Sequence, residues 1–169
     1  MDQNLDSKLQ IKSKLLNFYN FNKVKIFIFI FVILLILISI IFLKYKNNRN
    51  NILISEKYVQ AGLNLSSNEK DNAKILYEEI ILKKNKFYSI LALNTIIEKD
   101  LINDSVKILN YFKILENLNY SEEKQDLIIF KKALYFLKIS NNVEGNRLLN
   151  NLIKKNSKYK LLAEEAIAN

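Results

Sequence analysis

Three pairs of adjacent carboxylates come nearest to a catalytic pattern in this chain. They are Glu78-Glu79, Glu122-Glu123 and Glu164-Glu165. Acid–base catalysis needs groups positioned on one reacting atom, whereas neighbouring residues of a helix point about 100° apart. We therefore interpret these pairs as solvated helix faces or as favourable charges at helix starts.

The other residues that usually carry chemistry are missing from the sequence. It contains no His and no Cys, which removes the commonest neutral-pH acid–base group and the thiolate nucleophile. It also shows no glycine-rich phosphate loop and no metal-spaced cluster. We expect no enzymatic activity, no cofactor and no bound metal.

A run of apolar residues from Ile26 to Leu43 contains one hydroxyl, Ser39, and no charge, Gly or Pro. As a helix it would be about 27 Å long, close to the ~30 Å hydrocarbon core of a bilayer. The alternative of a buried core helix is disfavoured because the run has no polar stripe. A signal peptide is disfavoured because KYKNNRNN follows the run without a small-residue cleavage site. We predict a retained transmembrane helix over 26–43.

The span separates a basic head, residues 1–25, from a domain over 44–169. Five lysines precede the span within the head, and Lys44, Lys46, Arg49 and Lys57 follow it. Under the positive-inside rule, five basic residues before the span against four after it are nearly a tie. The rule acts best on short segments, so we give more weight to the lysines of the head. We predict a cytoplasmic head and an exported domain. The head is expected to be either a short amphipathic helix along the membrane, over Leu5 to Tyr19, or a disordered tail.

The chain has a net charge of +9, of which the head contributes three. The lysines are scattered among Asn and Glu, without the aromatic-interleaved stripe typical of nucleic-acid surfaces. We expect no nucleic-acid partner. The absence of Pro and the presence of only two Gly favour helix nearly throughout.

Beyond residue 51 the apolar residues recur at helical spacing in short segments. Polar breaks such as SSNEKD and SNN separate them. The fold class predicted is all-α, with one transmembrane helix followed by amphipathic helices. The seven expected segments are Ile54 to Leu65, Ala73 to Ile81, Tyr88 to Glu98, Asp104 to Glu116, Ser121 to Ile139, Val143 to Lys154 and Tyr159 to Ala168.

These segments repeat with a period near 34. The segment that begins at Ala73 aligns with one that begins at Val106, 33 residues on, and with one at Gly145, a further 39. Such a period, with two helices per unit, is typical of tetratricopeptide-type hairpins. The small residues, with Gly62 on the preceding helix, would allow close helix approach, and Tyr77 would fill the space between helices. A generic helical bundle is the alternative.

This layout resembles the tetratricopeptide-repeat-like bacterial inner-membrane proteins that include the ancillary subunit of the Sec translocon. The residues that carry the resemblance are the span, YVQAGLNLSSNEKDNAKILYEEII over Tyr58 to Ile81, and FYSILALNTI over Phe87 to Ile96. The resemblance implies a single-pass inner-membrane protein with a periplasmic domain that contacts translocon subunits, chaperones or secreted clients. It implies no catalytic residues.

Stacked hairpins present a concave wall formed by the first helix of each pair. The residues predicted to face this protein-binding groove are Tyr58, Asn94, Lys131 and Tyr135, with core packing as the alternative for the two tyrosines. The predicted function is a membrane-anchored protein-interaction module. The alternative is a structural envelope protein that acts by self-association as a homo-oligomer without a client.

Overall fold

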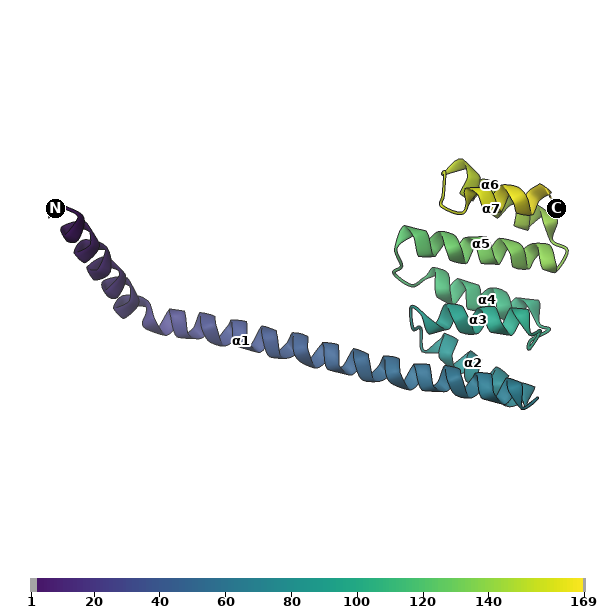
Figure 1. Cartoon of the computed structure of the whole chain (residues 1–169), viewed down its shortest axis with the longest axis horizontal. Coiled ribbons are helices and arrows are strands. Elements are labelled where there is room, and N and C mark those ends of the chain that lie inside the picture. Colours follow the sequence, from purple (N-terminus) through teal and green to yellow (C-terminus); the bar gives the residue numbers. More distant parts are fainter. Residues whose placement is uncertain (1–2, 169) are drawn as a thin grey trace. The chain divides into compact units, whose positions relative to one another are not determined.

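The computed structural model of the chain describes the backbone of residues 3–168 and the side chains of residues 14 and 21–168. Seven helices and no strands are present within these limits (Figure 1). The predicted all-α fold is confirmed for this part. The helices are α1 (Gln3–Ser66), α2 (Lys70–Leu82), α3 (Tyr88–Glu98), α4 (Ser105–Glu116), α5 (Glu122–Lys138), α6 (Asn142–Lys154) and α7 (Lys160–Ala168).

The chain divides into two compact units, Met1–Arg49 and Asn50–Asn169. Near the N-terminus, α1 is long and apolar enough to cross a membrane. Every large apolar side chain from Phe27 to Leu43 is exposed, so this surface would be favoured in hydrocarbon. The hydroxyl of Ser39 donates to the carbonyl of Leu35 at 2.8 Å, which satisfies it within the helix.

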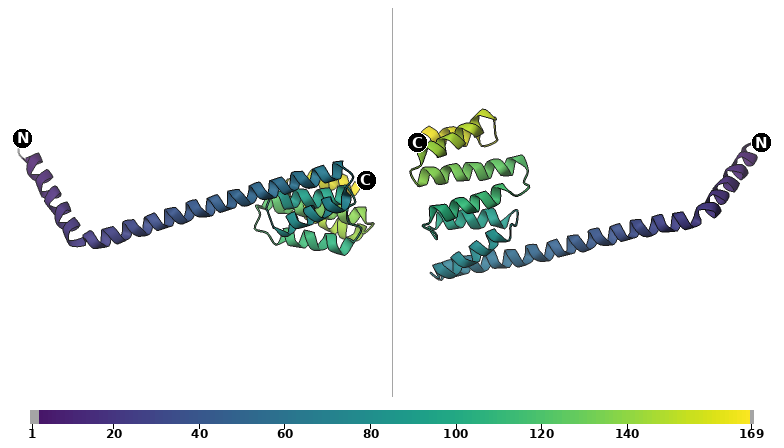
Figure 2. Two further views of the ribbon diagram at one scale, coloured as in Figure 1. Left: turned by 90° about the horizontal axis from the view of Figure 1, so that it is seen from below. Right: turned by 180° about the vertical axis from the view of Figure 1, so that it is seen from behind.

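In the second unit, consecutive helices run in alternating directions and stack into an array of two rows (Figures 1 and 2). The C-terminal part of α1 forms the first row together with α3, α5 and α7, and the second row consists of α2, α4 and α6. Within the second row, Lys107 of α4 pairs with Glu78 of α2 at 2.5 Å. Contacts within the first row are the Tyr58–Tyr88 rings at 5.7 Å, Lys138 Nζ to the Ile97 carbonyl at 2.8 Å, and the Phe130–Tyr159 rings at 5.7 Å.

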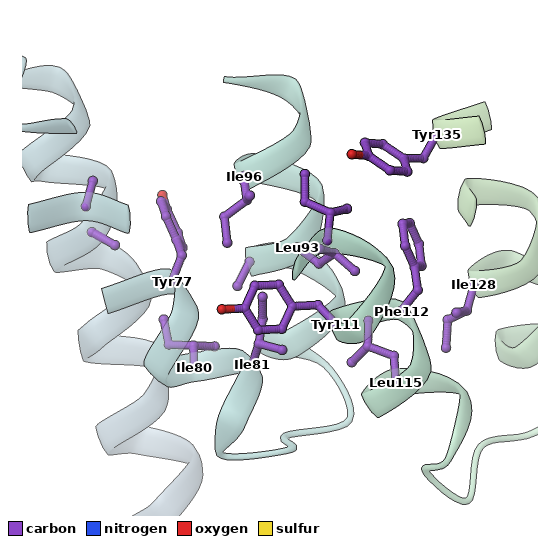
Figure 3. Close-up of a cluster of buried hydrophobic side chains, with 14 of the residues drawn as sticks. Tyr77, Ile80, Ile81, Leu93, Ile96, Tyr111, Phe112, Leu115, Ile128 and Tyr135 are labelled. Carbon is purple, nitrogen blue, oxygen red and sulfur yellow. The ribbon is translucent and has the colours of Figure 1, made fainter. Parts of the chain in front are cut away.

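A core of apolar side chains fills the space between the two rows from α1 to α5. Tyr77 and Phe112 are its largest fully buried side chains (Figure 3), and each such burial contributes roughly 1.5–3 kcal/mol. A smaller cluster around Leu149 and Leu152 joins α5, α6 and α7. No helix of the array buries its apolar stripe alone, so the stacking supplies the core.

The turns between helices form without glycine or proline. Asn68, Asp100, Ser140 and Asn156 have φ between 49° and 62°, and each follows a helix end. The next residue donates its N–H to a carbonyl five residues back, as Glu69 does to Asn64 at 2.8 Å. This is the Schellman motif, so the polar breaks in the sequence end helices through left-handed residues.

The observed helix boundaries differ by one residue or less from those predicted for α3 to α7. The predicted head, span and first amphipathic segment, however, form one continuous helix, because no residue between 3 and 66 is a Pro and the one Gly lies in its last turns. The head is therefore helical from Gln3. The side chains that would make it amphipathic, over Leu5 to Tyr19, lie outside the described ones apart from Lys14.

Four of the five predicted repeat positions lie at helix contacts. Ala73 is fully buried, Tyr77 is 2 % exposed, and a Cβ on Gly62 would lie 3.9 Å from the Tyr77 hydroxyl. A Cβ on Gly145 would lie 2.6 Å from Leu137 Cδ2, so α6 approaches α5 as closely as a glycine allows.

Val106 departs from the predicted pattern. It is 67 % exposed and does not mediate helix approach. The buried positions recur instead at offsets of 35 and 37 residues, so that Ile108 is equivalent to Ala73 and Gly145. The aligned buried sets are Ala73, Tyr77 and Ile80 in α2, Ile108, Phe112 and Leu115 in α4, and Gly145, Leu149 and Leu152 in α6.

Candidate interaction surfaces

A groove runs between α1 and α2. Two hollows form it, of about 460 Å³ and 340 Å³, and both are lined by Gln60. We call this surface the α1–α2 groove. Its lining residues are Asn50, Leu53, Ile54, Glu56, Lys57, Ile80 and Lys83 in the first hollow and Asn64, Glu69, Asn72, Ile75 and Leu76 in the second.

The α1–α2 groove is lined by both apolar and polar side chains. Leu53 is 59 % exposed and Ile75 is 51 % exposed, although both line a concave surface. An ion pair between Lys57 and Glu79 fixes α2 against α1 beside the first hollow. The groove therefore offers two apolar contact points on a rigid wall, with the Gln60 amide between the two hollows.

The structure places both predicted groove tyrosines in helix packing. The Tyr58 ring meets the Tyr77 ring edge-on at 5.5 Å, and its hydroxyl lies 3.3 Å from the Thr95 hydroxyl. Tyr135 is 5 % exposed and packs on Phe112 at 6.0 Å. Burial raises the pKa of Tyr135, and the charge of Asp104 adds to this. A role of either tyrosine in binding stays a prediction.

Asn94 and Lys131, the other two predicted residues, lie around one carboxylate at the α3–α5 seam. The Asn94 amide donates to Glu98 at 3.4 Å. Partial burial lowers the pKa of Lys131, while the charge of Glu98 opposes this shift. Asn94 and Lys131 are therefore both partly buried residues that interact with exposed Glu98. Their participation in a binding groove also stays a prediction.

The adjacent carboxylates serve the packing of the array. Glu78 pairs with Lys107 on α4, and the pKa of Tyr111 is raised mainly by burial and further by its interaction with Glu78. Its neighbour Glu79 points instead to Lys57 on α1. The two members of the pair therefore serve different helices, as their angular separation requires.

A second ionic cluster ties the start of α5 to the α6–α7 loop. Asp126 is 3 % exposed, accepts from the Ser157 hydroxyl at 2.5 Å and pairs with Lys155. The bond to Asp126 raises the pKa of Lys155. Glu123 binds Lys158 at 2.9 Å. Among the described residues, no group of three or more acidic, His or Cys side chains is placed to hold a metal ion.

The sequence analysis did not identify the α1–α2 groove. Its signal was present in Leu53 and Gln60, seven residues apart on α1 and outside the stripe that predicts the core. Single exposed apolar residues such as Leu53 and Ile75 are common on protein surfaces, so only the folded structure shows that these two line hollows.

Comparisons with known proteins give no relative for this chain. No family model matches it, and neither a curated protein nor a solved structure is similar to it.

Proposed function

We propose that this protein is a membrane-anchored protein-interaction module that binds a polypeptide segment of another protein in the α1–α2 groove. The observation that carries this proposal is the groove itself, with exposed Leu53 and Ile75 in a concave wall. Large apolar side chains that packing leaves exposed in a hollow are typical of docking sites.

The N-terminal helix supports a location at the membrane. Its exposed apolar stretch is long enough to span a bilayer once. In this proposal the head lies in the cytoplasm of a bacterium and the helical array in the periplasm, with residues 44–169 as a degenerate stack of tetratricopeptide-like hairpins. The two-row stacking and the recurring buried positions of α2, α4 and α6 support such a stack.

The resemblance to the inner-membrane family of the Sec translocon's ancillary subunit gives the class of partner. Translocon subunits, periplasmic chaperones and secreted clients all offer apolar segments that a groove of this kind would bind. The groove shows two apolar contact points and a central amide, which suits a short amphipathic helix or an extended segment. The role proposed is recognition, without covalent chemistry.

Site-specific photocrosslinking in cells tests the proposal. A photoreactive residue at Gln60 is expected to capture another protein, whereas one at exposed Lys113 on α4 is not. The variant with Leu53→Asp and Ile75→Asp should lose about tenfold or more of the captured partner, while Val106→Asp, at an equally exposed apolar residue outside the groove, should lose none. Equal capture at Gln60 and Lys113 would refute the groove as the binding surface.

The membrane location has its own tests. The full-length chain should stay with vesicles during an alkaline carbonate wash, because a spanning helix is held by burial in hydrocarbon. Protease added to spheroplasts should degrade residues 44–169, and protection of this domain would place it in the cytoplasm.

Self-association is the second candidate, and α7 is the observation that favours it. Leu161 is 77 % exposed and Leu162 48 % exposed, and only Ala163 of this helix is fully buried. A defined homo-oligomer in detergent that Leu161→Gln dissociates, with no other protein bound, would favour this function over client recognition.

A further inference from the structure

We propose that the α2–α3 loop together with the last residue of α2, residues 82–87, is a second membrane contact that binds the headgroups of anionic phospholipids. The loop carries Lys83, Lys84 and Lys86 between Leu82 and Phe87. The two apolar side chains are 58 % and 57 % exposed, and the three lysines are exposed as well. We call this segment the basic loop.

The charge of the basic loop is not neutralised within the described part of the chain, where no ion pair to any of its three lysines is present. The α6–α7 loop, the other lysine-rich turn at this end of the array (Figure 1), differs. There Lys155 binds Asp126 and Lys158 binds Glu123. The α4–α5 turn, residues 117–121, contains no charged residue. At this end of the array, the basic loop therefore combines three unpaired lysines with two exposed apolar side chains, Leu82 and Phe87.

The basic loop has a fixed conformation. The Asn85 side chain accepts from the backbone N–H groups of Phe87 and Tyr88, both at 2.9 Å, and so caps α3. Its amide donates to Asn51 of α1 at 2.7 Å. Lys84 adopts a left-handed conformation with φ 56°. These contacts fix the backbone of the loop, so binding would order only the side chains of the lysines and Phe87.

The bond to Asn51 ties the basic loop to a residue that follows the apolar run closely in the sequence. Asn51 follows the end of the apolar run, Leu43, by eight residues, which is about 12 Å along a helix and less than about 29 Å in any conformation. A lysine side chain and a Debye length of about 8 Å cover the shorter of these distances. An aromatic residue beside lysines is the composition of segments that lie in the headgroup region.

This proposal does not depend on binding in the α1–α2 groove. Its test attaches a label at residue 83, which also lines the groove, and this labelled position is the same in every variant compared. The full chain contains no Cys, so Lys83→Cys accepts a single fluorophore in the loop. The labelled chain is reconstituted in vesicles with 30 % phosphatidylglycerol or with phosphatidylcholine alone. Quenching by headgroup-spin-labelled lipid then reports how often the loop touches the surface.

We expect strong quenching in the anionic vesicles and weak quenching in the neutral ones. The added changes Lys84→Gln and Lys86→Gln should lower the ratio of docked to undocked loop by about fivefold each at low salt. The matched variant Lys70→Gln and Lys99→Gln removes the same charge from the opposite end and should leave quenching unchanged. Circular dichroism verifies that both variants keep their helix content.

Two results would overturn the proposal. One is equal quenching in the two lipid compositions, and the other is quenching that the Lys84 and Lys86 changes do not reduce. Loss of photocrosslinks at Gln60 would leave it standing, since that result concerns the groove alone.

Discussion

Replacing Gly145 by alanine tests whether α6 packs on α5 as closely as the structure shows. The added methyl group would lie 2.6 Å and 2.9 Å from two carbons of Leu137 and 3.2 Å from the carbonyl oxygen of Ala133. Leu137 can move its side chain, but the backbone at Ala133 cannot move without separating the two helices. The variant therefore requires a shift of α6 away from α5.

The expected magnitude follows from two opposed effects. Overpacking of this kind costs about 1–3 kcal/mol, whereas alanine in place of glycine in a helix interior gains about 1 kcal/mol. We expect a net loss near 1 kcal/mol. For a unit of about 120 residues, this corresponds to a fall of about 3–5 °C in melting temperature.

Gly62 provides the matched control because it is the other glycine of the chain and also lies in a helix. A Cβ there would meet only the Tyr77 hydroxyl, at 3.9 Å, which is ordinary contact. Gly62→Ala should therefore gain about 0.5–1 kcal/mol from helix propensity without opposition. The two substitutions are chemically identical and are expected to have opposite signs.

Thermal melts of the full chain in detergent, followed by far-ultraviolet circular dichroism, measure both effects. The spanning helix should stay folded, so the transition reports the array. Adding Leu137→Ala to Gly145→Ala should cost less than Leu137→Ala alone, because the truncation also relieves the overlap. Gly145→Ala at or above the wild-type melting temperature, or equal signs for the two alanine variants, would refute the close packing.

Three further outcomes are expected. Asn85→Ala should destabilise the array by about 1 kcal/mol through loss of the α3 cap, measured by urea denaturation, and an unchanged midpoint would contradict this. Asp126→Ala should cost about 2 kcal/mol because Lys155 and Ser157 lose their buried partner; a loss no larger than that of Val106→Ala would argue against the cluster. Burial raises the pKa of four tyrosines above about 10, so their protonated forms stabilise the fold below that pH and this contribution is lost as the pH rises above it. Tyrosinate absorbance at 295 nm from these residues should therefore appear together with helix loss; it would contradict their burial if it came first. The four tyrosines are Tyr77, Tyr111, Tyr120 and Tyr135.

The helices of the array could be predicted from the sequence because two local signals agree at most boundaries. Apolar residues at helical spacing mark each buried face, and a polar residue in a left-handed conformation follows the stripes of α1, α2, α3, α5 and α6. In SNN after α5, Ser140 takes this conformation and Asn141 accepts from the N–H of Glu144. Here one helix ends and the next begins within three residues.

The continuity of α1 could not be predicted in the same way. KYKNNRNN, residues 44–51, is polar and separates two apolar patterns, which indicates a break. Yet it contains no Pro or Gly, and Tyr45 lies beneath the Arg49 guanidinium at 5.9 Å, a contact made four residues apart on a helix. Polarity indicates where a segment meets water, whereas a helix ends only where the backbone finds another set of hydrogen bonds.

The register of the repeat could not be predicted from matching residues in the sequence, whereas the buried positions of the folded helices define it. Lys-Ile-Leu after Ala73 and after Val106 match in sequence, but the match aligns buried Ala73 with an exposed residue. A shift of two residues aligns Tyr77 with Phe112, the largest fully buried side chains of their helices. The register is fixed by the large side chain that each helix inserts between the rows. In a chain rich in Lys and Ile, short sequence matches such as Lys-Ile-Leu arise by chance. The α1–α2 groove could not be predicted for a related reason. Whether an apolar residue such as Leu53 is exposed becomes clear only once the packing shows which residues form the core.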